Sequence, residues 1–122
     1  MEPLDAPLLL TRPQRLLVLL TAAGVALSRL LAVSKTLWDW DEVQFAMAVD
    51  EYDVPLYRPH PPGFPLFIAL AKVARLAVPS DFRALQVVTT IAATLLFPLL
   101  FFLFRELRFP FATAWSGALL AV

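Results

Sequence analysis

The 122-residue chain contains no cysteine, which excludes disulfides, Cys-ligated zinc sites and thiol nucleophiles and leaves the redox compartment undetermined. It also carries no net charge, because ten Lys and Arg residues balance ten Asp and Glu residues. No overall field would attract nucleic acid, so we expect no nucleic-acid partner. Internal repeats and low-complexity tracts are missing as well, and nothing indicates a repeat architecture.

Charge of either sign is scarce, since 16% of the residues are charged and 60% are hydrophobic. Ordinary soluble domains are about 45–50% apolar, so the composition predicts a membrane protein. Apolar runs of helical length predict an all-α, polytopic transmembrane helical bundle. The runs place spans at about 16–33, 64–78 and 82–104, with an incomplete one at 109–122.

The first span follows Arg12 and Arg15, and the positive-inside rule therefore places the N-terminus in the cytoplasm. As a helix, residues 16–33 would cover about 27 Å, close to the hydrocarbon core of roughly 30 Å. A cleaved signal peptide is the competing interpretation. Arg29 interrupts the apolar core and is interpreted as a side chain that snorkels near the outer end, which favours a retained span.

Two spans carry faces that predict contact with other helices. Small residues recur on the first span and polar residues on the third, at helical spacing: Thr21, Gly24, Ser28 and Ala32, then Arg83, Gln86, Thr90 and Thr94. Ser80 is predicted to cap the third span.

The later part of the chain leaves its topology open. The run 64–78 covers only about 22 Å as a helix, so it either returns through a thinned membrane or re-enters on the same side. A full crossing puts Arg105 and Arg108 outside, against the positive-inside rule, and re-entry puts them inside. The run 109–122 stops before it could cross, which predicts that the chain is a fragment.

The outer loop, residues 34–62, is net acidic. It holds six of the ten acidic residues, which are Asp39, Asp41, Glu42, Asp50, Glu51 and Asp53. Such a loop can bind a divalent cation such as Mg²⁺, Mn²⁺ or Zn²⁺, but no diagnostic ligand spacing is visible. We therefore assign no cofactor and leave the metal unknown.

Within the loop, residues 39–52 predict a short helix. Asp39 is the expected N-cap and Glu42 stands three positions later, as in a capping box. Aromatic residues on broad apolar faces, Trp38 and Trp40 among them, predict that this helix lies in the membrane interface.

Asp41 is the candidate general base, because it lies in the first turn of that helix and is not the capping residue. A carboxylate at the membrane surface, near cationic side chains, suits transfer of a group from a lipid-linked phosphate. When that group is a sugar, the phosphate that leaves needs little protonation, whereas the incoming hydroxyl must lose a proton. Arg58 and His60, from the other end of the loop, are candidates to hold the phosphate. The structural alternatives are that Glu42 only caps the helix, that residues 50–53 form a solvated face, and that His60 is a turn residue.

The order of motifs resembles the start of the multi-span glycosyltransferases of the GT-C type. Tryptophan precedes Asp41-Glu42 and Phe45-Ala46, and residues 60–66, His-Pro-Pro-Gly-Phe-Pro-Leu, open the next helix. The resemblance is strongest to the branch of aminoarabinose transferases of lipid A, protein mannosyltransferases and Rgt-type transferases. It covers only the N-terminal portion of such a protein.

The resemblance implies inverting glycosyl transfer at the outer face of a bacterial inner membrane. The donor would be a polyprenyl-phosphate-linked sugar and the acceptor a hydroxyl or amine on a lipid, protein or glycan. It implies candidate catalytic residues at Asp41 and Glu42 and adds His60 to the donor-phosphate site, where Arg58 stands near it. The fragment itself is expected to be inactive alone. The rival hypothesis is a small transporter subunit or helical membrane scaffold without catalysis.

Overall fold

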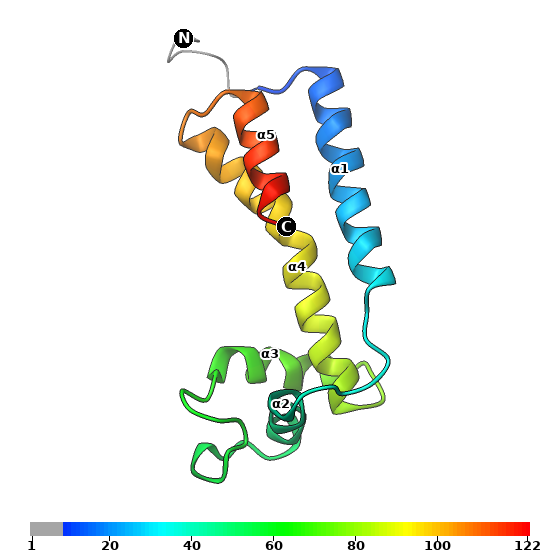
Figure 1. Cartoon of the computed structure of the whole chain (residues 1–122), viewed down its shortest axis with the longest axis vertical. Coiled ribbons are helices and arrows are strands. Elements are labelled where there is room, and N and C mark those ends of the chain that lie inside the picture. The colour runs from blue at the N-terminus through cyan, green and yellow to red at the C-terminus, as the bar shows by residue number, and fades with distance from the viewer. Residues whose placement is uncertain (1–8) are drawn as a thin grey trace. The chain divides into compact units, whose positions relative to one another are not determined.

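The computed structural model describes residues 9–122, which form helices joined by turns (Figure 1). No strand occurs among them, and the only β-type pairing is an isolated bridge between Asp53 and Arg58. The elements are α1 (Arg12–Leu31), α2 (Trp40–Asp50), the 3₁₀ turn η1 (Val54–Leu56), α3 (Pro65–Arg75), α4 (Asp81–Glu106) and α5 (Phe111–Leu120). The predicted all-α class is confirmed.

Two of these helices, α1 and α4, are long and apolar enough to cross a membrane. Their 20 and 26 residues correspond to about 30 and 39 Å. Helix α3 has 11 residues and α5 has 10, so each covers about half of the hydrocarbon core. The full multi-span bundle stays a prediction, in which only the first and third spans have helices of sufficient length.

Local sequence signals explain where the helices begin. Thr11 and Gln14 form a reciprocal capping box at the start of α1. Ser80 Oγ accepts a hydrogen bond from the Arg83 amide at 3.3 Å, so the predicted cap of α4 is confirmed. Helix α3 ends at Arg75, three residues before the predicted end, and the Arg75 side chain donates to the Val78 carbonyl at 2.8 Å.

The described chain divides into two compact units. We call residues 9–32 with 92–122 the apolar unit and residues 33–91 the loop unit. Helix α4 contributes residues 81–91 to the loop unit and the remainder to the apolar unit.

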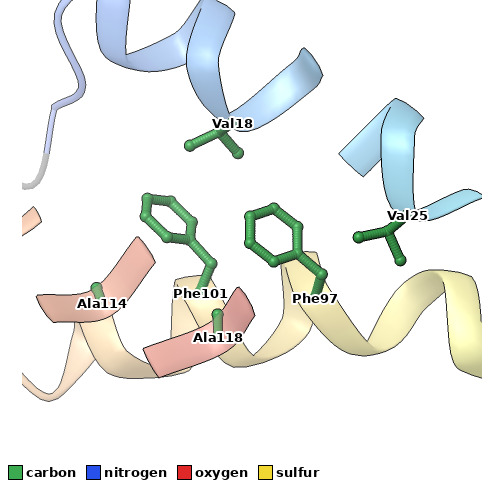
Figure 2. Packing of buried hydrophobic residues seen from close by; sticks show 6 residues of the cluster. All are labelled: Val18, Val25, Phe97, Phe101, Ala114 and Ala118. Carbon is green, nitrogen blue, oxygen red and sulfur yellow. The ribbon is translucent and has the colours of Figure 1, made fainter. Parts of the chain in front are cut away.

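The apolar unit packs around two phenylalanines of α4. Phe97 and Phe101 are fully buried, and Figure 2 shows their rings pointing toward Val18 and Val25 of α1. Small side chains of α5, Ala114 and Ala118, complete the cluster. Alanines allow α5 to approach α4 closely, because they add little bulk at the contact.

Only part of the predicted small-residue face of α1 makes contacts within this unit. Thr21 accepts a hydrogen bond from Trp115 Nε1 at 3.0 Å, but a Cβ added to Gly24 would meet no atom within 4 Å. Ser28 is exposed. The larger valines of α1 fill the space beside the phenylalanine rings, which small residues would leave empty.

Arg29 contacts the end of the described chain. Its Nη2 donates to the backbone carbonyl of Val122, while its Nε is buried without a hydrogen-bond partner. The last carbonyls of a helix lack partners within that helix and carry partial negative charge. The guanidinium therefore interacts with a residue beyond the end of α5, and its snorkelling stays a prediction.

The loop unit has a smaller core. Val49 of α2, Ala71 of α3 and Leu85 of α4 are buried together, with Phe45 and Phe67 packed against them. One polar face of α4 also contributes, because Gln86 Nε2 donates to the Ser34 carbonyl at 2.5 Å. Within the polar face predicted at residues 83–94, Gln86 therefore makes a packing contact.

Candidate functional site

The start of α2 sets the position of the candidate base. Asp39 is the N-cap, as predicted, and its carboxylate accepts from the Trp40 amide at 2.6 Å. The Glu42 carboxylate accepts from the Trp38 amide, also at 2.6 Å. The predicted reciprocal capping box is therefore wrong in detail, because each carboxylate takes a different amide. Together the two carboxylates hold the helix start.

Glu42, predicted as a second catalytic carboxylate, is occupied by this backbone contact. A carboxylate that accepts a main-chain N–H at the first turn of a helix stabilises that turn and complements the helix dipole. Its neighbour Asp41 makes no such contact and has a side chain that is 60% exposed. Of the two acids, Asp41 is the one without a hydrogen bond to the backbone, and the catalytic role of each stays a prediction.

The fold brings Asp41 and His60 together from opposite ends of the loop. Asp41 Oδ1 lies 3.7 Å from His60 Nδ1, which is ion-pair range when the imidazole is protonated. The His60 side chain is 28% exposed. The predicted meeting of the two ends of the loop therefore occurs at this pair.

Gln44 belongs to the same site and was missed by sequence reasoning. It is 5% exposed, the one buried polar residue in the described core, and its Oε1 lies 3.1 Å from His60 Nδ1. Gln44 follows Asp41 by one helical turn, so both face the same way. The sequence feature that could have identified Gln44 is its position as a polar residue between the apolar residues Val43 and Phe45.

Aromatic rings surround the imidazole. The rings of Phe45 and Phe64 each lie 5.5 Å from that of His60, inclined at 74° and 69°. Phe45 and Phe64 are themselves edge-to-face at 5.2 Å, and Phe67 packs on Phe45. Such contacts restrict the rotation of the His60 ring.

The backbone of the loop that carries His60 has a specific shape. Asp53 and Arg58 exchange two main-chain hydrogen bonds, of 2.7 and 2.8 Å. Gly63 has φ +89, and a Cβ there would lie 2.5 Å from the Tyr52 hydroxyl oxygen. Only glycine combines this left-handed conformation with so close an approach. The loop therefore depends on Gly63 to lead His60 into α3.

Arg58, the other predicted phosphate ligand, pairs with Glu51. That carboxylate neutralises the guanidinium, and the role of Arg58 toward an anionic ligand stays a prediction. The predicted solvated face is correct for Asp50 and Glu51, which are exposed. It is wrong for Asp53, which is half-buried and whose carboxylate accepts from the Leu56 amide at 3.3 Å to cap η1.

Metal ligation receives no support from the side-chain groupings. Among residues 9–122, no three His, Asp or Glu side chains come together in a way that could hold a metal ion. Asp41 and His60 form a pair of two ligands at most.

The arrangement joins an exposed carboxylate, able to accept a proton, to an imidazole that can carry positive charge. Trp38 and Trp40, which flank the start of α2, are 83% and 69% exposed. Exposed tryptophans of this kind are typical of a membrane–water interface.

No family model, curated protein or solved structure matches the chain. The glycosyltransferase resemblance therefore rests on the sequence motifs alone and stays a prediction.

Proposed function

We propose that the chain forms the donor end of an inverting, membrane-embedded glycosyltransferase, which moves a sugar from a polyprenyl phosphate to an acceptor hydroxyl or amine. The observation that carries the proposal is the pairing of exposed Asp41 with His60 at 3.7 Å. A base and a potential cation side by side are what transfer from a phosphate-linked sugar requires.

In this proposal Asp41 takes the proton of the acceptor as the acceptor attacks the anomeric carbon. His60, as imidazolium, binds a phosphate oxygen and stabilises the charge that grows on the departing polyprenyl phosphate. Because that phosphate leaves as an anion, no separate general acid is needed. Glu42 and Arg58 serve as supports, through the Trp38 amide and through Glu51.

The surroundings suit a lipid-linked donor. Trp38 and Trp40 are exposed on either side of Asp39 in the sequence, and tryptophans favour the depth of lipid headgroups. Helices α1 and α4 have the length and composition of membrane spans. We therefore propose that the pair works at the outer face of a bacterial inner membrane, where a polyprenyl phosphate would present its headgroup.

Binding is the first test. The chain in nanodiscs should quench or shift its tryptophan fluorescence when undecaprenyl phosphate is added, and phosphatidylglycerol at the same level should have little effect. His60→Gln should weaken this binding at least tenfold. Equal responses to both lipids would contradict the proposal.

Transfer is the second test, and because the chain is expected to be inactive alone, it is measured on the full-length protein in its native membranes with radiolabelled polyprenyl-phosphate hexoses and pentoses. Asp41→Asn should lower transfer by at least about 100-fold, the usual contribution of a general base, and leave donor binding intact. Asp50→Asn is the matched control, because it makes the same chemical change at the other, exposed end of α2. Full transfer by Asp41→Asn would favour the scaffold or transporter-subunit hypothesis.

A further inference from the structure

The contacts of His60 Nδ1 set which ring nitrogen can meet a ligand. Two oxygens face Nδ1, Gln44 Oε1 at 3.1 Å and Asp41 Oδ1 at 3.7 Å. An ionised carboxylate can only accept hydrogen bonds, and an amide oxygen also accepts. Both neighbours therefore favour a proton on Nδ1.

We propose that Gln44 is a positioning residue that holds the His60 proton on Nδ1 and so presents Nε2 to the ligand. The buried amide suits this role, because it is 5% exposed and water competes little for its oxygen. The edge-to-face contacts with Phe45 and Phe64 keep the ring from turning the other nitrogen toward Gln44.

A consequence concerns the charge state in which the site binds phosphate. With Nδ1–H directed to Gln44, neutral imidazole has only a lone pair on Nε2 and repels a phosphate oxygen. A second proton makes Nε2 a donor and the ring a cation. This step rests on the proposed function, and it restricts phosphate binding to the imidazolium form.

The charged groups near His60 agree with this assignment. Asp41 is the charged side chain found against the ring, from α2, while Phe45 of the same helix and Phe64 before α3 are neutral. Arg58, two residues away, is paired with Glu51. Asp41 therefore adds a second acceptor beside Nδ1, and Gln44 fixes the direction of the ring in both charge states.

The tautomer can be measured directly, because His60 is the only histidine in the chain. In protein labelled with ¹⁵N-histidine and reconstituted in lipid, solid-state NMR above the imidazole titration should show a protonated Nδ1 and an unprotonated Nε2. Free histidine in water favours the opposite neutral tautomer, so this result would report the protein environment. A wild-type ring with the proton on Nε2 would overturn the inference.

Variants of Gln44 test its part in this. Gln44→Leu removes the acceptor at similar size and should shift the neutral ring toward the Nε2–H tautomer. Gln44→Glu keeps an acceptor and should preserve Nδ1–H, which also guards against a folding defect in the leucine variant. Gln86→Leu, a matched change at the Ser34 contact, should leave the ring unchanged. Persistence of Nδ1–H in Gln44→Leu would overturn the role of Gln44.

Binding of polyprenyl phosphoglucose, a phosphodiester whose charge stays constant, separates this inference from the proposed function. Wild-type affinity should fall steeply as the pH rises and the ring loses its second proton. Gln44→Leu should bind the lipid about five- to tenfold more weakly at low pH, the equivalent of about one hydrogen bond. Its affinity should depend less on pH than that of the wild type, because a neutral ring with the proton on Nε2 can still donate. Parallel profiles would overturn the charge-state inference. If no variant binds at any pH while the tautomer shifts as expected, the proposed function fails and the positioning role of Gln44 stands.

Discussion

The apolar unit and the loop unit are stabilised by different means. In the apolar unit, two fully buried phenylalanines of α4 pack against valines and alanines. In the loop unit, Arg58 pairs with Glu51, Arg75 pairs with Asp81, and His60 lies beside Asp41. Its turns depend on residues with positive φ such as Tyr57 and Gly63.

This difference shows where each unit is sensitive to change. Packing is lost in proportion to the volume that is removed, wherever the residue is buried. A polar loop depends on a few hydrogen bonds and special backbone conformations, and neighbouring exposed residues can be replaced at little cost. Variants in the two units should therefore differ in how much stability they lose and in how far the structural change extends.

The largest effect on stability is expected from Phe101→Ala. The side chain is fully buried and contacts Phe97 and Phe111, so its removal leaves a cavity worth about 3 kcal/mol. Unfolding in an SDS titration, followed through Trp115 of the same cluster, would measure this. The His60 NMR signals should stay in place.

Leu99→Ala is the control for that measurement, because Leu99 lies on the same helix and is 64% exposed. Its cost should stay within about 1 kcal/mol. If both variants cost the same, packing around Phe101 does not stabilise the apolar unit in the way described.

A smaller, local effect is expected from Gly63→Ala in the loop unit. The added Cβ would lie 2.5 Å from the Tyr52 hydroxyl oxygen and 2.6 Å from Val54 Cγ2, at φ +89. We expect a loss of about 1–3 kcal/mol together with displaced His60 signals.

Gly24→Ala supplies the opposite case. Gly24 lies inside α1 with open space around it, so alanine should stabilise the helix by about 0.5–1 kcal/mol. Thermal unfolding followed by circular dichroism would compare the two variants. If both variants changed the stability in the same direction, the contrast between the helix and the loop would be contradicted.

The smallest effect is expected at the ion pair that joins the end of α3 to the start of α4. Arg75 Nε lies 2.8 Å from Asp81 Oδ1, with side chains 41% and 37% exposed. After screening by solvent, Asp81→Asn should cost about 0.5–1 kcal/mol. The cost should shrink in high salt. Glu51→Gln, at the more exposed pair with Arg58, should cost less still, and a larger loss there would reverse this order.

Sequence reasoning predicted the elements with strong local signals. Asp39 and Ser80 cap the helices they were expected to cap, because a capping side chain interacts with amides only a few residues away. The end of α3 was placed three residues too late, since the side chain of Arg75 interacts with the carbonyl of Val78 and no apolar pattern reports that contact.

At the candidate site, the sequence predicted some of the residues and missed contacts between others. Asp41 and His60 lie 3.7 Å apart, and their joint role in one site stays a prediction. Gln44 and the pairing of Arg58 with Glu51 were missed, because each contact depends on a partner elsewhere in the loop. The spacing of residues along a sequence does not show which of several carboxylates will form an ion pair with a given cation.

The sequence by itself determined the helical class, the two long apolar helices and the concentration of acidic residues between the first helix and residue 62. These follow from composition and from periodicity within one element. Only the tertiary structure decided that Asp41 remains exposed while Glu42 accepts a hydrogen bond from the Trp38 amide, and that Gln44 faces the imidazole of His60. Those outcomes depend on which oxygen lies nearest to each nitrogen once the loop has closed, and a distance between residues 16 positions apart is a property of the folded chain.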